Sequence, residues 1–259
     1  MTLTAEEQAE LTVAKNRLEN PSLAAKLADA VGKPAERLIE ALPESANEKI
    51  MEASRSALLK SLKLVAKTLR EPSGTEARVK QHKIAALVSG GVGGALGLTA
   101  LAAELPISTG IILRSILDIA RSEGEDVRSA PTQLAGLTVL ALGGRSAADD
   151  GAEVGYWATR TVLARSLAEV AEFLAEKGLA GEAAPVLVQL IHKVAARFSV
   201  QVSEKFAAQA IPVLGAIGGG ALNMIFIDHF QDMARGHFVI RRLERKYGTA
   251  IVQSAYENA

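Results

Sequence analysis

The sequence contains no cysteine, few aromatic residues and no excess of charge of either sign. The absence of cysteine excludes disulfide bonds, thiol catalysis and thiolate metal sites. The 29 basic residues are balanced by 29 acidic residues, and a chain without net positive charge does not have the composition of a nucleic-acid-binding protein. We therefore expect no nucleic-acid partner, no metal ion and no cofactor.

The first twenty residues lack the pattern of an export signal. Such a signal places basic residues before an apolar run, whereas residues 1–20 are polar and acidic. Absence of cysteine is also typical of proteins in reducing compartments. These features predict a cytoplasmic location, and they leave peripheral association with the inner membrane open.

Strand patterns are missing as well, because no run alternates convincingly between apolar and polar residues. Hydrophobic residues make up 49% of the chain but aromatic residues only 4%, so alanine, leucine and valine dominate the apolar content. Alanine, leucine and the long charged residues favour helix. We expect an all-α helical bundle forming one domain over residues 1–259. Residues 1–75 are expected to form an amino-terminal helical layer, and residues 76–250 the core.

Capping signals and chain breaks predict where the helices begin and end. Thr4 and Glu7 form a capping box that predicts a helix to about residue 19. Ser45 and Glu48 form a second box, which predicts a helix to about residue 70. Proline, glycine and polar breaks delimit further helices. These are expected at residues 22–31, 34–42, 107–124, 131–142 and 153–177, and from residue 185 onward.

Two glycine-rich apolar stretches, residues 84–118 and 206–235, are expected to form two central helical hairpins covered by amphipathic helices. Pro106 and Pro212 interrupt them, and we expect each helix to bend or break there because proline removes a backbone donor and clashes one turn back. Glycines four residues apart share a helical face, where two backbones can approach closely. The glycines singled out on this basis are Gly90, Gly94, Gly97, Gly215 and Gly219.

Both stretches contain a segment without charged residues that is long enough to span a membrane, residues 84–103 and 206–227. In the first segment, strongly apolar residues contribute roughly −2 to −4 kcal/mol toward insertion, and the glycines oppose that sum. The composition therefore favours buried core helices over spans. The glycine faces then either pack helix against helix or line a groove for an apolar ligand or the membrane, and both interpretations are kept.

Basic residues precede the first stretch and follow the second. They are Arg78, Lys80, Lys83, Arg241, Arg242 and Arg245. One interpretation is that they contact the anionic headgroups of phospholipids at a membrane surface. The other is that they lie in solvated helical turns, where positive charge near a helix carboxyl end is favourable.

Carboxylates and a histidine cluster in the second stretch. Asp228 and Asp232 share a helical face, and His229 lies between them in sequence. Arg114 and Asp118, four residues apart in the first stretch, can pair with each other or face this cluster. A metal or acid–base site is one interpretation, and a salt-bridge network between helices is the other. The sequence contains no HExxH motif, phosphate-binding loop or nucleophile motif.

Three segments resemble the signatures of the EcsC protein family in their order and spacing. The first comprises GGVGG at 90–94, LPIST at 105–109 and RSI at 114–116, and the second is LTVLALGG at 137–144. The third is IPVLGAIGGGALN at 211–223, followed by Ala234, Arg235, Arg241, Tyr247 and Gly248. The resemblance covers roughly residues 80–250, and the amino-terminal layer is less diagnostic.

The resemblance implies a bacterial, all-helical protein that is cytoplasmic or peripheral to the membrane, and it transfers no catalytic residue. We favour a non-enzymatic protein that binds an apolar ligand or a membrane surface, because the chain has too few spans for an ordinary transporter. The family is named for a gene linked with an ABC-exporter operon, so an accessory protein of a membrane transporter or stress system is a second hypothesis. A third is a hydrolase-type enzyme using Asp228, His229 and Asp232. No oligomeric state is predicted.

Overall fold

The computed structural model describes residues 2–19, 22–32, 44–68, 98–143, 155–177, 185–209 and 215–259. Within these ranges every regular element is a helix, which confirms the predicted all-α class. The helices are α1 (Ala5–Glu19), α2 (Leu23–Val31), α4 (Glu44–Thr68), α6 (Leu98–Ser122), α7 (Ala130–Leu140), α8 (Tyr156–Lys177), α9 (Pro185–Gln209), α10 (Gly215–Tyr247) and α11 (Thr249–Glu257).

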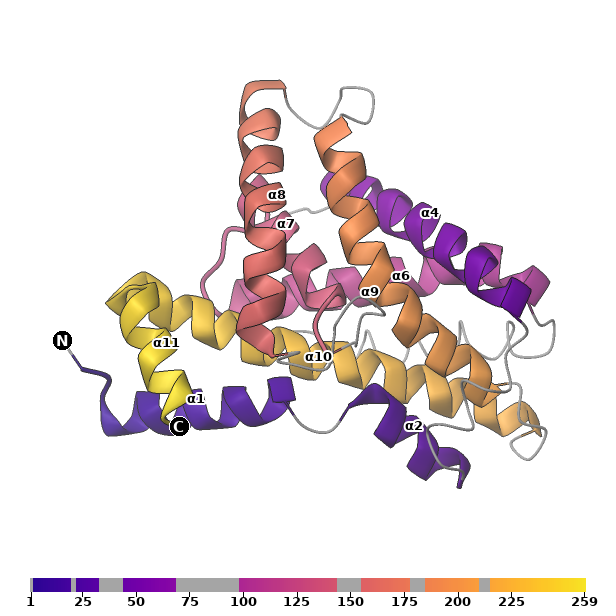
Figure 1. Ribbon diagram of the computed structural model, residues 1–259, viewed down its shortest axis with the longest axis horizontal. Coiled ribbons are helices and arrows are strands. Elements are labelled where there is room, and N and C mark those ends of the chain that lie inside the picture. The colour runs from indigo at the N-terminus through magenta and orange to yellow at the C-terminus, as the bar shows by residue number, and fades with distance from the viewer. Residues whose placement is uncertain are drawn as a thin grey trace.

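The helices form a bundle around α10, which has 33 residues (Figure 1). Helices α1 and α2 run along α10, and α6, α7 and α9 also contact it. Helix α4 packs on α6 and α9, whereas α8 packs on α7 and α9. Helix α11 folds back from the end of α10 onto α1. Helix α10 is therefore the element that most of the bundle shares.

The first two helices begin and end where the sequence predicts. Thr4 Oγ1 accepts the Glu7 N–H at 3.2 Å, and the Glu7 carboxylate accepts the Thr4 N–H at 3.0 Å, so the capping box is confirmed. Helix α2 begins after its cap Ser22 and ends at Gly32, whose φ of 65° is left-handed. Glycine adopts that conformation without the steric penalty that a side chain brings.

Helix α6 does not break at Pro106. The sequence predicted a bend or a break there, and the helix runs without interruption from Leu98 to Ser122 with Pro106 inside it. Proline still costs its turn a backbone hydrogen bond. However, the Pro106 carbonyl accepts a hydrogen bond from Ser61 of α4 at 3.3 Å, and α4 packs along α6. Packing against a neighbouring helix thus outweighs the local preference of proline.

Much of the two glycine-rich stretches lies outside the described residues. This holds for Gly90, Gly94, Gly97 and Pro212, for the basic residues Arg78, Lys80 and Lys83, and for the helix expected at 34–42. Gly215 and Gly219 lie in the first turns of α10. Among the helices of the described ranges, none has the length and hydrophobicity that crossing a membrane requires.

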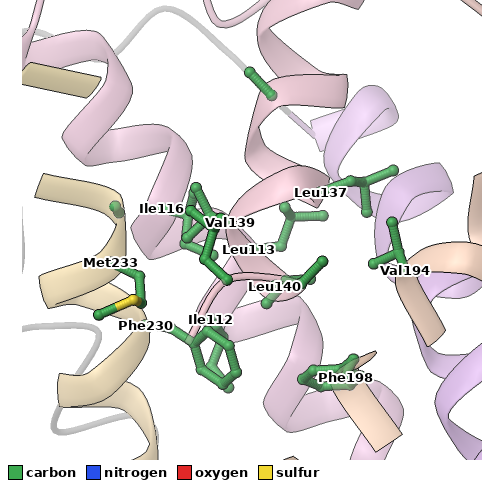
Figure 2. Close-up of a cluster of buried hydrophobic side chains, with 14 of the residues drawn as sticks. Ile112, Leu113, Ile116, Leu137, Val139, Leu140, Val194, Phe198, Phe230 and Met233 are labelled. Carbon is green, nitrogen blue, oxygen red and sulfur yellow. The ribbon is translucent and has the colours of Figure 1, made fainter. Parts of the chain in front are cut away.

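A continuous apolar core joins α6, α7, α9 and α10 (Figure 2). Helix α7 is buried on every side from Thr132 to Leu140, as its mostly apolar sequence favours. The rings of Phe198 on α9 and Phe230 on α10 lie 5.7 Å apart between their centroids. The side chains labelled in Figure 2 are at most 2% exposed: Ile112, Leu113, Ile116, Leu137, Val139, Leu140, Val194, Phe198, Phe230 and Met233.

Helices α1 and α10 approach each other closely at Gly236. A Cβ atom at this position would lie 2.6 Å from Leu18 Cγ and 2.9 Å from the carbonyl oxygen of Ala14. The crossing therefore requires a residue without a side chain. Helix packing at a glycine therefore occurs at Gly236. The sequence had predicted it at other glycines.

Candidate functional site

The structure places His229 and Asp232 in different surroundings. Asp232 forms ion pairs with Lys26 of α2 at 3.1 Å and with Arg235 at 3.2 Å. His229 is fully buried, and neither of its ring nitrogens has a hydrogen-bond partner in the described part of the chain. Neither the Asp228 nor the Asp232 carboxylate therefore forms a hydrogen bond with the imidazole. Asp232 instead takes part in a salt bridge between helices, which was the alternative interpretation.

His229 is packed tightly by its neighbours. A Cβ atom on Gly143 would lie 2.8 Å from the ring, and the Phe230 ring lies edge-on at 5.3 Å between centroids. Burial, and next the positive charge of Lys26, lower the pKa of His229 to about 3, although Asp232 opposes them. The ring is therefore neutral at physiological pH. Within the described ranges, no group of three or more histidine, aspartate or glutamate side chains can hold a metal ion.

Arg114 and Asp118 belong to α6, and Asp118 accepts hydrogen bonds from Arg121 one turn later at 2.9 and 3.2 Å. Arg114 also takes part in an interaction within the protein. One buried polar contact between α6 and α10 is neutral, because Gln231 Nε2 donates to Ser115 Oγ at 2.8 Å. This part of the interface between the two predicted stretches therefore depends on an amide and a hydroxyl group.

The basic end of α10 is engaged by carboxylates. Arg241 donates to both oxygens of Glu125, at 2.9 and 3.2 Å, and Arg245 also pairs with Glu125. Arg242 pairs with Glu10 and with Glu123, each at 2.8 Å. Burial would favour the neutral acid, but the hydrogen bonds and charge of Arg241 more than offset it and lower the pKa of Glu125. These arginines thus tie α10 to α1 and to the loop before α7.

A cavity of about 290 Å³ lies between α7, α8 and α10 and is partly open to solvent. Its lining residues recur three or four positions apart on each helix, so each helix contributes one face. Seven of the eleven are apolar, which is typical of a small-molecule site with a few polar groups. The lining comprises Pro131, Leu134, Ala135 and Thr138 of α7, Arg160, Ala164, Leu167, Ala168 and Ala171 of α8, and His237 and Arg241 of α10.

The polar end of the cavity is an ordered network around Arg160. Its guanidinium donates to both oxygens of Glu244, at 2.9 and 3.0 Å, and to the hydroxyl of Tyr156 at 3.2 Å. The guanidinium carbon also lies 4.8 Å from the centroid of the Trp157 ring, a geometry that adds cation–π attraction. Burial opposes the charged form, but Tyr156 and Glu244 outweigh it and raise the pKa of Arg160. Arg160 is therefore a fixed positive charge.

His237 is oriented by the same network. It is 2% exposed, and its Nδ1 lies 2.9 Å from the hydroxyl oxygen of Tyr156. Because this hydroxyl accepts from Arg160 and has no other acceptor for its own hydrogen in the described residues, it donates to Nδ1. Burial, then the charges of Arg160 and Arg241, lower the pKa of His237 well below its usual value. The neutral ring then carries its hydrogen on Nε2.

The Nε2–H group of His237 has no hydrogen-bond acceptor in the part of the chain that the structure describes. An unsatisfied buried donor costs about 1–3 kcal/mol, so such groups in folded proteins require an explanation. His237 lines the cavity, but its Nε2 atom is itself buried. The polar side chains in the lining besides His237 are Thr138, Arg160 and Arg241.

The fold is a helical bundle with a partly open cavity of small-molecule size between α7, α8 and α10. The family model of the EcsC protein family matches residues 5–243. The chain therefore belongs to the EcsC protein family, as its glycine- and proline-containing signatures predicted. The match also includes α1, α2 and α4, whose sequences by themselves were less diagnostic of the family. Comparison with curated proteins and with solved structures found no match.

Tyr156, Arg160 and His237 were not among the site residues predicted from the sequence. One signal was present, because Arg160, Ala164 and Ala168 are spaced four residues apart and place small side chains beside an arginine on one helical face. However, alanines at this spacing are common in helix packing. Arg241, which was predicted as a headgroup contact, does line the cavity.

Proposed function

We propose that this member of the EcsC family is a non-enzymatic protein that binds a small amphipathic molecule between α7, α8 and α10. The observation that carries the proposal is the cavity of about 290 Å³, whose walls are mainly alanine and leucine and whose lining also includes Arg160 and Arg241. Apolar walls with a few convergent polar groups are the usual composition of such sites.

The size of the cavity favours a ligand with one short chain. Its volume corresponds to about ten water molecules at about 30 Å³ each. Along α8 the lining extends from Arg160 to Ala171, a distance of about 16 Å at 1.5 Å per residue. A single chain of about eight carbons matches this space, since octanoate has about ten non-hydrogen atoms. A phospholipid with two long chains is too large to be enclosed.

The hydrolase hypothesis has less support. An activated nucleophile or general base needs a hydrogen-bonded partner and access to substrate. His229 is buried without such a partner in the described ranges, and Asp232 is committed to Lys26 and Arg235. The geometry around His229 and Asp232 thus favours a structural role for these two residues.

The membrane-surface and transporter hypotheses remain predictions. Arg241, Arg242 and Arg245 form ion pairs with glutamates, which reduces the charge that they offer to headgroups. A cytoplasmic location with peripheral membrane association is compatible with the proposed ligand, because a single-chain amphiphile partitions between membranes and binding proteins.

Calorimetric titration with octanoate tests the proposal. We expect one site per chain with a dissociation constant between about 1 μM and 1 mM, a range that ligands of this size reach without exceeding known limits per atom. Ala168→Trp places a large side chain in the cavity and should abolish saturable binding. Ala175→Trp is the matched control, because Ala175 is also exposed on α8 but does not line the cavity.

The control variant also separates folding from binding. Both tryptophan variants should unfold in urea at similar concentrations, since both substitutions are at exposed positions. If octanoate binds equally to both variants, or does not saturate the wild-type protein, the cavity is not the site and the proposal is wrong.

A further inference from the structure

Building on the proposed function, we infer that Tyr256 of α11 is a positioning residue for the cavity between α7, α8 and α10. Tyr256 does not line the cavity. It packs instead on two aromatic side chains that contact Arg160, whose side chain is part of the lining. The affinity of the cavity for its ligand is therefore set in part by a helix outside it.

Helix α11 is folded back against the bundle by a turn at Gly248. This residue has a φ of 87°, a conformation that glycine adopts without the penalty that a side chain brings. The turn brings α11 beside α1 (Figure 1). The buried residues of α11 are Val252 and Tyr256, and Tyr256 is 3% exposed. The packing of α11 on the bundle therefore depends largely on these two side chains.

Tyr256 is held in place by α1. Lys15 Nζ donates to the carbonyl oxygen of Tyr256 at 2.9 Å and lies 5.3 Å from the centroid of its ring, so cation–π attraction adds to the hydrogen bond. The Tyr256 hydroxyl donates to Glu19 at 2.9 Å. These contacts fix both the main chain and the ring of Tyr256.

The Tyr256 ring also contacts the two aromatic residues at the start of α8. Its centroid lies 5.8 Å from the centroid of Tyr156 and 5.8 Å from that of Trp157. Tyr156 accepts a hydrogen bond from Arg160 at 3.2 Å, and the Trp157 centroid lies 4.8 Å from the guanidinium carbon. A continuous series of contacts thus leads from α1 through Tyr256 and the two rings to Arg160 at the cavity.

Removal of the Tyr256 ring should loosen the two aromatic rings and, through them, Arg160. A side chain that becomes ordered only when a ligand binds weakens binding, because its conformational entropy is then lost during association. For one long side chain this corresponds to about a three- to tenfold loss of affinity. Glu244 still pairs with the guanidinium, so binding should weaken without being abolished.

Calorimetric titration of the full-length protein with octanoate tests the inference. Tyr256→Ala removes the ring and should weaken binding about three- to tenfold. Tyr256→Phe keeps the ring and loses only the hydrogen bond to Glu19, so it should retain the wild-type affinity within about twofold. Val252→Ala is the matched control, because it shortens the other buried side chain of α11 and leaves the ring in place. It should bind octanoate as the wild-type protein does.

The fluorescence of Trp157 gives a readout that a loss of stability alone does not change. Trp157 is the only tryptophan in the sequence, and its ring lies edge-on to that of Tyr256, at 89°. Under conditions in which all variants are folded, acrylamide should quench this fluorescence more strongly in Tyr256→Ala than in Val252→Ala. Equal quenching in these two variants would contradict a route through Trp157.

The outcomes distinguish this inference from the proposed function. If octanoate saturates the wild-type protein and binds equally well to Tyr256→Ala, Tyr256 does not position the site, although the cavity remains a binding site. If Val252→Ala or Tyr256→Phe weakens binding as much as Tyr256→Ala does, the assignment to the ring is wrong. Failure of octanoate to saturate the wild-type protein overturns the proposed function itself, and this inference with it.

Discussion

Helix α10 carries two buried histidines, His229 and His237, in different surroundings. Both are at most 2% exposed, and burial lowers the pKa of each. Around His229 the protein is closely packed, and neither ring nitrogen has a partner in the described residues. His237 instead receives a hydrogen bond from Tyr156 on one side and borders a cavity on the other.

This difference shows that burial and a neighbouring carboxylate do not by themselves identify a site. His229 lies beside Asp228 and Asp232 in sequence but contacts neither through its ring nitrogens. At His237 the ring is oriented by a second residue, Tyr156, and the residue belongs to the lining of the cavity. We expect the surroundings of His229 and the surroundings of His237 to respond differently to the same kinds of substitution.

The largest difference is expected when the salt bridge near each histidine is removed: Arg160–Glu244 near His237, and Lys26–Asp232 near His229. Arg160→Ala leaves Glu244, whose side chain is 11% exposed, without its partner. Breaking a buried pair in this way should lower the free energy of unfolding by about 3 kcal/mol. Lys26→Ala, near His229, should lower the free energy of unfolding by about 1 kcal/mol or less, because Asp232 is 34% exposed and retains Arg235. Urea unfolding monitored by circular dichroism measures both, and equal losses would contradict the distinction.

The second largest difference in stability is expected when a larger side chain is introduced beside His229 or into the cavity. Gly143 has a φ of 72°, and a Cβ atom there would lie 2.8 Å from His229. Gly143→Ala should therefore lower the free energy of unfolding by about 2–3 kcal/mol through backbone strain and overpacking. Ala164→Leu adds more atoms but points them into the cavity, so it should cost less than about 1 kcal/mol. A larger loss for Ala164→Leu would mean that the cavity is not available to a side chain.

Replacing each histidine by leucine should change stability in opposite directions. His229→Leu removes two unsatisfied buried nitrogens and should raise the free energy of unfolding by about 1 kcal/mol. His237→Leu leaves the Tyr156 hydroxyl without its acceptor and should lower this free energy by about 1–2 kcal/mol. Measured in the same denaturant series, two changes of the same sign would show that His229 has an unrecognised partner.

The pH dependence gives the smallest and most specific difference. The pKa of His229 is about 3 in the folded protein and about 6.5 in the unfolded chain. The unfolded state therefore binds the additional proton, so the contribution of His229 to stability is complete above pH 6.5 and declines as the pH falls toward 3. Between pH 6.5 and 5.5 the wild-type protein should lose about 1 kcal/mol more than His229→Leu. Identical pH profiles would show that His229 is not neutral in the folded state.

The local features of the fold were predictable from the sequence, because they depend on neighbouring residues. The capping box at Thr4 and Glu7 and the glycine end of α2 follow from spacing alone. The continuity of α6 through Pro106 was not predictable, since it depends on packing against α4 and on the hydrogen bond from Ser61. Close helix packing at Gly236 likewise depends on where α1 crosses α10.

The candidate site was less predictable because its parts are distant in sequence. Tyr156 and His237 are 81 residues apart, and Arg160 and Glu244 are 84 residues apart. The sequence placed His229 near two carboxylates along one helix, but hydrogen bonding depends on side-chain direction and on other helices. Arg241 was predicted to contact headgroups because of its charge, and the structure pairs it with Glu125 at the edge of the cavity.

The most direct test of the central claim is anomalous diffraction from crystals of the protein with 8-bromooctanoate. The bromine atom marks the end of the chain opposite the carboxylate. We predict one bromine peak per chain between α7 and α8, near Leu167 and Ala171, with the carboxylate toward Arg160 and Arg241. A bromine peak elsewhere, or none at a concentration that saturates the protein in solution, would contradict the assignment of this cavity as the ligand site.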